Sequence, residues 1–410
     1  MQIAESRSCL LRAFQSALTA VNGASRVATY LSSRPPMDVV YLLAFGKAAC
    51  PMARAAHEVL SERVRGTLIV TKQGYAEALP WPVREAGHPL PDAHSLEAGS
   101  ELVRFISRMP RDASVMVLLS GGASTLVEQP AGGLALAQLR AINEWLLGAG
   151  LDIAQMNAVR KRMSQLKGGR LAGLLAPRTV LCLAISDVPG DDAAVIASGP
   201  LVQQVHPPAE LPQALPPELR AALEQITPAP YPPPSAFRAV EMRIIATNED
   251  AKQAAAATGR DLGYQVQVHA ATLGGDAIEA GRRLAHEVVS GAGGTLHVWG
   301  GETTMRLPPR PGRGGRNQSL ALAAASVLHG RDDVVFLAAG TDGSDGPGGD
   351  AGALVDGGTV LRGRAAGLDE RAAIVDADAG RFLDASGDLL FTGPTETNVM
   401  DIVLGLKLSS

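Results

Sequence analysis

The chain has 410 residues, a net charge of −4 and a pI near 6.1, and this length allows two or three domains with sizeable cores. Its apolar content of 46% excludes wholesale disorder, and an acidic chain with only 4% aromatic residues is a poor ligand for nucleic acid. No apolar stretch is long enough to span a membrane, the N-terminus lacks a signal-peptide pattern, and the three cysteines have no metal-ligand spacing. We therefore expect a globular, cytoplasmic protein that binds neither nucleic acid nor membranes.

Short apolar or β-branched runs alternate with helical sequence along the whole chain, which predicts an α/β fold. Most of these runs are almost continuously apolar, as is typical of parallel strands covered by helices on both faces. The predicted strands are Val39–Phe45, Thr67–Thr71, Val115–Leu119, Thr179–Ile185, Arg243–Ala246, Gln265–His269, Thr295–Trp299 and Val334–Ala338.

A proline-rich stretch separates the fourth predicted strand from the fifth. Residues 207–234 hold ten of the 27 prolines, with one helical segment at Pro217–Ile226. Because such density stiffens and extends the backbone, we interpret the stretch as a linker between an N-terminal domain, residues 1–238, and a C-terminal domain, residues 239–410. Each half also has a glycine turn with hydroxyl residues after a strand (Gly121–Thr125 and Gly300–Thr304), so we expect the ligand to lie in a cleft between the domains.

Lys47 follows the first predicted strand in "AFGKAA". This is not a P-loop, because Tyr41 stands at the required glycine position and Ala48 at the required hydroxyl position. A cation at the carboxyl end of a buried strand nevertheless faces the usual ligand crevice of an α/β sheet. The alternative is a lysine that merely extends from a strand end into solvent.

The stretch "LLSGGASTL" predicts an oxyanion site. The backbone N–H groups of Ser120, Gly121 and Gly122 can approach an anion, and the hydroxyl of Ser124 adds a donor at the start of a helix. A second candidate is the helical segment "MNAVRKRMSQLKGGRLA". Its apolar residues Ile153, Met156, Val159, Met163 and Leu166 predict a buried stripe, and its other side carries Asn157, Arg160, Lys161, Ser164 and Lys167. Because five basic residues occur from Arg160 to Arg170 without an acid, this side is expected to attract a carboxylate or phosphate.

Carboxylates follow two further predicted strands. Asp187 comes directly after the fourth, with Asp191 and Asp192 after a Pro-Gly turn, and such groups suit a hard cation such as Mg²⁺ together with ligand phosphates. Helix capping is the alternative for Asp191 and Asp192 but does not account for Asp187. In the second half, Asp342 follows the last predicted strand in a loop without a basic residue; an EF-hand is excluded because Ala353 stands where its glutamate is required.

Two common enzyme signatures are absent. No predicted strand is followed by G-x-G-x-x-G, so a standard dinucleotide site is unsupported, and G-x-S-x-G is missing as well. The remaining candidate is "GRGGRNQ", a glycine-rich entry to a helix that contains Arg313 and Arg316.

Taken together, these motifs resemble those of the type II glycerate kinases, the MOFRL family that includes glycerate 2-kinase and whose members often carry a hydroxypyruvate reductase label. The matching stretches are "AFGKAA", "GHPLPD", "LLSGGAS", "MNAVRKRMSQLKGGRLA", "ISDVPGDD", "ASGP", "GGETT", "GRGGRNQ", "AAGTDGSDGP" and "FTGPTETNVMDI". They run in family order over residues 40–402, most of the chain.

The resemblance implies a Rossmann-like N-terminal domain, a smaller α/β domain of the MOFRL type, and ATP-dependent phosphorylation of D-glycerate to 2-phosphoglycerate with Mg²⁺. It places catalysis on Lys47, Asp187, Arg316 and Asp342. It also implies the following contacts: glycerate with Ser120, Gly121, Gly122, Ser124, Asn157, Arg160 and Lys161; the nucleotide with Gly300, Gly301, Glu302, Thr303, Gly314 and Asn317; and the metal with Asp187 and Asp191. Phosphoryl transfer relies on positioning and charge neutralisation, which these residue types can supply.

Two other functions remain as alternatives. An NAD(P)H-dependent hydroxypyruvate reductase would bind a substrate of similar shape, but the dinucleotide signature is missing. A non-enzymatic sugar-phosphate-binding protein could use the same glycine turns, but would not need the two aspartates beside a lysine and an arginine. The expected partners are D-glycerate and ATP, and a homodimer is left open.

Overall fold

The computed structural model describes residues 2–34, 38–151, 153–204 and 210–409, and the chain forms two compact units. Residues 23–246 form one unit, and residues 1–22 together with 247–410 form the other. The predicted domains, residues 1–238 and 239–410, therefore differ from the observed units at both ends. The first helix belongs to the unit formed by the second half of the chain, and the boundary between the halves lies at Ala246 instead of 238.

The unit of residues 23–246 is built on a parallel six-stranded sheet in the order β3-β2-β1-β4-β5-β6. Its strands are β1 (Val40–Phe45), β2 (Val64–Lys72), β3 (Val83–Ala86), β4 (Ser114–Leu119), β5 (Thr179–Ile185) and β6 (Val240–Ala246). This is the strand order of doubly wound folds, in which the order of the strands in the sheet reverses between β1 and β4. The predicted parallel α/β sheet is thus confirmed, while β3 was not predicted.

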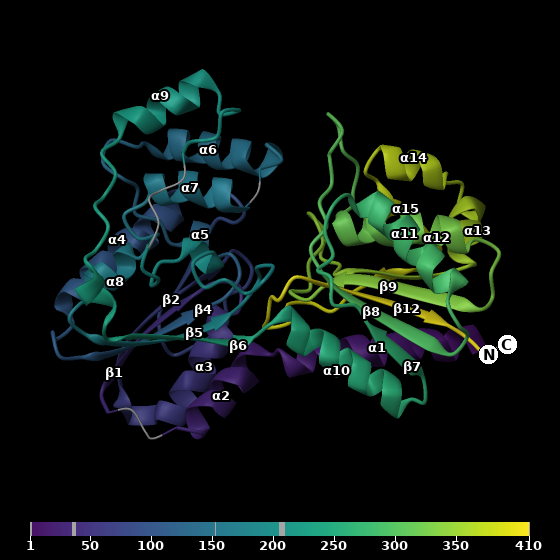
Figure 1. Ribbon diagram of the computed structural model, residues 1–410, viewed down its shortest axis with the longest axis horizontal. Coiled ribbons are helices and arrows are strands. Elements are labelled where there is room, and N and C mark those ends of the chain that lie inside the picture. The colour runs from purple at the N-terminus through teal and green to yellow at the C-terminus, as the bar shows by residue number, and fades with distance from the viewer. Residues whose placement is uncertain (1, 35–37, 152, 205–209, 410) are drawn as a thin grey trace. The chain divides into compact units, whose positions relative to one another are not determined.

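Helices cover both faces of this sheet, as Figure 1 shows, with α2 and α3 on one side and α4, α5 and α8 on the other. The helices of the unit are α2 (Gly23–Ser32), α3 (Ala49–Leu60), α4 (Ala93–Arg108), α5 (Ala123–Leu126), α6 (Leu136–Gly148), α7 (Ile153–Met163), α8 (Arg170–Leu175) and α9 (Pro217–Gln225), with short 3-10 turns at Ser61–Arg63, Ile196–Ser198 and Pro234–Phe237. Coverage on both faces explains why β1, β4 and β5 are almost entirely buried and read as continuous apolar runs.

The proline-rich stretch is not a linker between the units. It connects β5 to β6, which are neighbours in one sheet, and its helix α9 packs through Leu223 and Ile226 against apolar side chains of α6 and α7. Residues 207–209 of this stretch lie outside the described residues. Because β6 pairs with β5, the prediction that Arg243–Ala246 starts the C-terminal domain was wrong.

The second unit contains a mixed six-stranded sheet in the order β11-β10-β9-β12-β8-β7. Its strands are β7 (Gln265–Val268), β8 (Thr295–Gly301), β9 (Val334–Gly340), β10 (Gly352–Asp356), β11 (Leu389–Leu390) and β12 (Asp401–Lys407). β12 lies between β8 and β9 and is antiparallel to both. The last three strands were not predicted, and they include the central one.

Helices α1 (Gln2–Ala20) and α10 (Asn248–Asp261) pack together on one face of this sheet, and α11 (Ala277–Ser290) and α12 (Arg316–Leu328) pack on the other. The remaining helices are α13 (Thr359–Ala365), α14 (Glu370–Val375) and α15 (Ala379–Ser386). Arg7 of α1 forms ion pairs with Asp356 (2.5 Å) and Asp388 (3.0 Å), which helps to explain why the N-terminal helix belongs to this unit (Figure 1).

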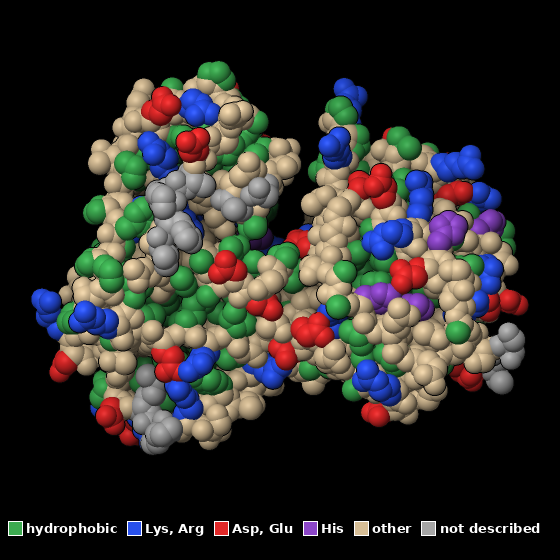
Figure 2. Space-filling view, viewed as in Figure 1, with side chains coloured by type: hydrophobic (Ala, Val, Ile, Leu, Met, Phe, Trp, Pro, Cys, Tyr) green, Lys and Arg blue, Asp and Glu red, His purple; other side chains and the backbone are tan. Residues whose placement is uncertain are grey.

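Charges of both signs are interspersed on the face shown in Figure 2, in keeping with the small net charge. In the part of the chain that the structure describes, no helix combines the length and the apolar character needed to cross a membrane.

Candidate active site

Three neighbouring parallel strands bring predicted site residues to one edge of the first sheet. Lys47 follows β1, Ser120 follows β4 and Asp187 follows β5, and these strands are adjacent in the order β1-β4-β5. The register aligns Phe45 with Leu119 and Leu119 with Ala184, so all three residues lie just beyond the carboxyl ends of the strands. Strands are about 4.8 Å apart, which places Lys47 and Asp187 about 10 Å from each other at the backbone. This edge contains the reversal point where doubly wound folds bind ligands.

The turns that follow β1 and β4 are hydrogen-bonded to each other. Lys47 N–H donates to the carbonyl of Gly121 (2.9 Å), and Ala48 N–H donates to the hydroxyl of Ser120 (3.0 Å). Gly46 has φ +125°, and a Cβ at this position would lie 2.2 Å from Ser120 Oγ, so only glycine fits. Ser120 is 2% exposed, and its hydroxyl is occupied in holding the lysine turn. The Ser120 hydroxyl therefore already has a structural role, which competes with its predicted contact with glycerate.

A chain of polar side chains leads away from the second turn. The hydroxyls of Ser124 and Ser198 lie 3.0 Å apart, and Ser198 donates to Oδ1 of Asn157 (2.8 Å). Asn157 is only 4% exposed, and its Nδ2 is buried without a hydrogen-bond partner. A buried unpaired donor is costly, so Asn157 has an amide hydrogen to offer to a ligand. Ser198 was quoted only within the "ASGP" motif and was not itself predicted.

Arg160 lies near Asp187 and adds a second cation to this edge, besides Lys47. Burial lowers the pKa of the Arg160 guanidinium, and the nearby carboxylate of Asp187 partly offsets this effect. The Nε of Arg160 is buried without a hydrogen-bond partner. Like the amide of Asn157, it is a donor that a bound anion would satisfy.

The remaining basic residues of the predicted stripe are used inside the protein. Lys167 forms a buried ion pair with Glu128, whose other oxygen accepts from Ser164 (2.6 Å). Arg170 donates to the carbonyls of Lys161 (2.8 Å) and Lys167 (3.0 Å). The expectation of an acid-free basic stripe was therefore wrong for Lys167, because its carboxylate partner comes from a distant part of the sequence.

Two further features of this helix differ from the prediction. Ile153, expected in the buried stripe, is 43% exposed, whereas the polar Asn157, Ser164 and Lys167 are buried. Lys161 remains half-buried, and its Nζ donates to Gln204 (3.1 Å).

Asp187 and Asp191 are the predicted metal ligands. Both are half-buried, and Asp191 N–H donates to the carbonyl of Val188 (3.1 Å) in the turn between them. Carboxylate oxygens at the mouth of a ligand crevice fit a Mg²⁺ ion that takes its other ligands from phosphates and water. Asp192 instead accepts from Ala194 N–H (2.8 Å) within a turn, and it caps no helix, because the next element is the 3-10 turn Ile196–Ser198 with Val195 at its N-cap.

His88 is a residue of this edge that the sequence analysis missed. It follows β3 in the "GHPLPD" motif, and a Cβ on Gly122 would lie 3.0 Å from its Cδ2. The imidazole therefore lies against the glycine turn after β4. Its place in the quoted motif was the only available signal, because β3 was not predicted and His88 and Gly122 are 34 residues apart in the sequence.

The predicted residues of the other unit gather around Asp401, the first residue of β12. Since β12 is antiparallel to both neighbours, Asp401 faces the last residues of β8 and β9, Gly301 and Gly340. Arg316 donates to both oxygens of Asp401 (2.7 and 2.9 Å) and contacts Glu302 at 2.7 Å. These carboxylates hold the pKa of the arginine above its ordinary value although burial opposes them. Asp401 was not predicted, since it stood unremarked in the "NVMDI" motif.

The N-terminus of α12 is occupied by Asp345. Its carboxylate accepts hydrogen bonds from the backbone N–H groups of Asn317 (3.1 Å) and Gln318 (2.8 Å). Burial raises the pKa of Asp345 to about 7, and its backbone donors oppose the shift. The helix start that the "GRGGRNQ" motif forms is therefore occupied by a side chain of the same unit. Nearby, Asp342 is 7% exposed and accepts from the backbone and hydroxyl of Ser344 (3.0 and 3.1 Å).

Close packing accounts for the glycines of "GGETT". Gly300 and Gly301 are the last residues of β8, and a Cβ would lie 1.9 Å from Asn248 Oδ1 at the first and 2.3 Å from Leu273 O at the second. Thr303 Oγ1 and Asn317 Oδ1 are buried without hydrogen-bond partners. Of the six predicted nucleotide contacts, these two side chains keep an unused polar atom.

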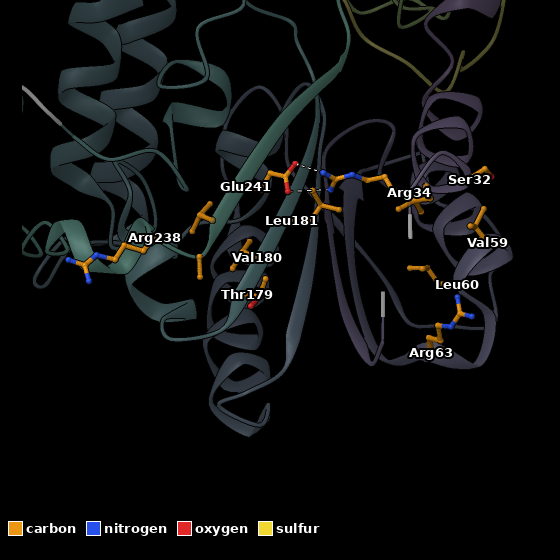
Figure 3. Close-up of a pocket in the computed structure, with 13 residues that line it drawn as sticks. Ser32, Arg34, Val59, Leu60, Arg63, Thr179, Val180, Leu181, Arg238 and Glu241 are labelled. Atoms are coloured by element: carbon orange, nitrogen blue, oxygen red, sulfur yellow. Dashed lines mark hydrogen bonds and ion pairs between the residues drawn. The ribbon is translucent and has the colours of Figure 1, made fainter. Parts of the chain in front are cut away.

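One cavity of the first unit lies away from the candidate site. It has a volume of about 620 Å³ and is lined by Thr179 and Val240 at the starts of β5 and β6, at the opposite edge of the sheet from Lys47. Arg34 and Glu241 form an ion pair at its wall (2.8 Å; Figure 3). None of the residues predicted for the site lines this cavity.

Comparisons with known proteins agree with the motifs. Residues 9–222 match the model described as "Domain of unknown function (DUF4147)", and residues 295–401 match the MOFRL family. A D-glycerate 2-kinase of Thermotoga maritima is 36% identical over 90% of this chain and 91% of the relative, and an Agrobacterium vitis relative named as a hydroxypyruvate reductase is 37% identical over 97% and 93%. The crystal structure of a glycerate kinase from Thermotoga maritima superposes with a TM-score of 0.82 at 33% identity, covering 99% of this chain and all of the other.

Proposed function

This chain belongs to the glycerate kinase family, matching its DUF4147 and MOFRL models and its curated members over most of their length, and on that premise we propose that it transfers the γ-phosphoryl group of ATP to D-glycerate, giving 2-phosphoglycerate and ADP. The observation that carries the proposal is the shared edge of β1, β4 and β5. One cation, one oxyanion turn and one carboxylate, Lys47, Gly121–Gly122 and Asp187, follow three adjacent strands there.

The carboxylate of glycerate is assigned to the donors after β4 and on α7. Asn157 Nδ2 and Arg160 Nε are buried without partners, and the hydroxyl chain from Ser124 ends at Asn157. A carboxylate satisfies unpaired buried donors better than a neutral group does, because charge-assisted hydrogen bonds are roughly twice as strong. The donors would hold the substrate with its hydroxyl group toward the phosphate.

Lys47 is assigned to the transferring phosphoryl group. In phosphoryl transfer the hydroxyl oxygen forms a bond to the γ-phosphorus while the bond to the bridging oxygen breaks, and the charge on the phosphoryl oxygens must be neutralised. The hydrogen bonds between the two turns fix the backbone of Lys47, so its flexible side chain extends from a defined point at the strand end. Mg²⁺, held by Asp187 and Asp191, would supply further neutralisation of the phosphates.

The catalytic roles of Arg316 and Asp342, in the other unit, rest on the family resemblance. Arg316 would contact phosphate oxygens with the donors that Asp401 and Glu302 leave, and Asp342 stays a predicted catalytic residue. Thr303 and Asn317 keep unpaired polar atoms, which supports nucleotide contacts for them. The packing of Gly300 and Gly301 and the ion pair of Glu302 supply structural reasons for those residues, and their nucleotide contacts, like that of Gly314, stay predictions.

Reduction of hydroxypyruvate is the second candidate, because one relative carries that name and the strand order is that of dinucleotide-binding folds. The turn after β1 argues against it. It contains Gly46-Lys47-Ala48 where G-x-G-x-x-G is required, and β2 ends in Lys72 instead of an acidic residue that could bind a ribose.

A paired assay tests the proposal. Purified enzyme is given ATP, Mg²⁺ and D-glycerate while ADP release is followed, and in parallel NADH with hydroxypyruvate while NADH oxidation is followed. We expect glycerate-dependent ADP release and no NADH oxidation, with the product identified by enolase, which accepts the 2-phosphate directly. NADH oxidation without ADP release would establish the reductase, and binding of glycerate without either reaction would indicate a non-enzymatic binding protein.

A further inference from the structure

Two histidines and a glutamate lie together at the β7 edge of the second sheet, in residues that the proposed reaction does not use. His297 lies within β8, His269 directly follows β7, and Glu287 lies on α11. One ligand atom from each of the three lies within 4.8 Å of the others, and among the described residues this is the only such group of three histidine, cysteine or acidic side chains. Three elements far apart in the sequence thus place metal-binding atoms at one point.

The separation of the two histidines is close to that of a metal site. His269 Nε2 and His297 Nδ1 are 3.1 Å apart. Glu287 Oε1 lies 3.6 Å from the other nitrogen of His269, Nδ1, and one ligand atom of each of the three residues lies within 4.8 Å of the others. Two nitrogens bound at 2.0–2.1 Å to a tetrahedral Zn²⁺ are about 3.3 Å apart. A small outward rotation of the two rings would therefore admit the ion between them.

The surroundings of both imidazoles disfavour a positive charge on them. Burial lowers the pKa of His269, with Lys252 and Arg283 acting in the same direction, and burial and His269 lower the pKa of His297. Glu287 opposes both shifts. His297 is 3% exposed, and its Nε2 is buried without a hydrogen-bond partner.

One histidine of the cluster is held in a buried strand, and the other two side chains are accessible to solvent. His297 is fixed in a buried strand and packs beside Trp299, whose ring also lies against His269 with centroids 4.6 Å apart. The side chains of His269 and Glu287 are 16% and 37% exposed, so an ion can enter from their side. Two histidines and one glutamate form a known donor set for zinc, with a fourth position left to water.

We propose that His269, His297 and Glu287 bind a zinc-class divalent cation that ties α11 to the β7–β8 edge. The site is separate from the Mg²⁺ of the proposed reaction, which is assigned to carboxylates of the other unit. Imidazole nitrogen favours zinc, whereas Mg²⁺ prefers oxygen ligands. The ion joins residues that are held together by no covalent bond, so its binding stabilises the folded unit.

The test uses untagged full-length protein freed of metal by a chelator. Zn²⁺ is titrated calorimetrically, Mg²⁺ is titrated in parallel, and thermal unfolding is followed with and without Zn²⁺. The variants are His269→Ala and Glu287→Gln, both at partly exposed positions. The matched control is His286→Ala, which removes an exposed histidine from the same helix next to Glu287. Visible absorption of the Co²⁺-loaded protein reports the coordination geometry.

We expect one Zn²⁺ per chain, a higher melting temperature in its presence, and tetrahedral Co²⁺ absorption. Removing an outer partner of a metal site costs 10–100-fold in affinity, so losing a ligand should cost about 100-fold or more. The control should bind like the wild type. The proposal is overturned if the wild type binds no stoichiometric zinc, if both variants bind within about threefold of it, or if His286→Ala loses as much affinity as they do. Since every readout is independent of phosphoryl transfer, the outcome does not depend on the proposed function.

Discussion

Replacing Asp401 by asparagine should weaken both the fold and the proposed reaction. The side chain of Asp401 is 2% exposed and accepts two hydrogen bonds from Arg316, which is 33% exposed and also contacts Glu302. Asparagine keeps the shape of aspartate but loses its charge, and one of its two terminal atoms becomes a donor that faces the guanidinium. The variant therefore leaves Arg316 with one carboxylate partner, the more exposed Glu302.

The expected loss of stability follows from this geometry. Removing one partner of a fully buried ion pair costs about 3–5 kcal/mol. Here the arginine is partly solvated and retains Glu302, so we expect a smaller loss, about 2–3 kcal/mol in the free energy of unfolding. Because a misplaced catalytic group can lower turnover about 100-fold, we expect a loss of that order in kcat for glycerate phosphorylation.

The free energy of unfolding is measured in urea, with the same dependence on urea concentration in each variant, and kcat is measured by steady-state ADP release. The Glu302→Gln variant serves as the comparison. Glu302 is 41% exposed, so its variant should lose at most about 1 kcal/mol. Asp401→Glu should restore part of the activity if the carboxylate positions Arg316. An Asp401→Asn protein with stability within about 0.5 kcal/mol of the wild type and unchanged kcat would refute the assigned role.

Four further changes test the first unit. Lys47→Ala should lower kcat at least about 100-fold with an unchanged circular dichroism spectrum, because the phosphate charge is no longer neutralised; activity within a few-fold of the wild type would contradict this. Asp187→Asn should raise the Mg²⁺ concentration needed for half-maximal activity, whereas an unchanged Mg²⁺ dependence in a weakened enzyme would assign Asp187 to orienting a neighbouring cation. Asn157→Ala should raise KM for glycerate about tenfold or more, since a hydrogen bond to a charged group is worth about 1.5–3 kcal/mol, and a KM that stays constant while kcat falls would count against substrate binding. Glu128→Gln should destabilise the protein by about 3–5 kcal/mol in urea unfolding because Lys167 is left buried and unpaired, and adding Lys167→Met should recover most of the loss.

Local signals were sufficient for many elements of the fold. All eight predicted strands are present. For β1, β4 and β5 the reason is that a buried parallel strand requires a continuous apolar run, which is visible in any short window. The strand-end positions of Lys47 and Asp187 were predictable for a related reason, and their part in a site stays a prediction. Each follows such a run directly, and the carboxyl ends of parallel strands are where α/β folds bind ligands.

The residues with which a side chain or segment packs could not be predicted in the same way. Lys167 belonged to a basic stripe in the sequence, and only the fold brings Glu128 to it. The proline-rich stretch had the composition of a linker, yet it packs α9 on α6 and α7 and leads to a strand of the same sheet. Composition describes the stiffness of a segment, whereas its partners depend on apolar contacts with distant residues.

The sequence by itself therefore determined the α/β class, the parallel character of the first sheet and the chemistry that follows its strands, because these depend on residues close together in the chain. The tertiary structure alone decided that α1 joins the second unit, that β12 is its central strand, and that Asp401 holds Arg316. Each of these depends on a pairing between segments separated by tens to hundreds of residues. Nothing in a local pattern specifies such a pairing, since it is selected by the packing of the whole unit.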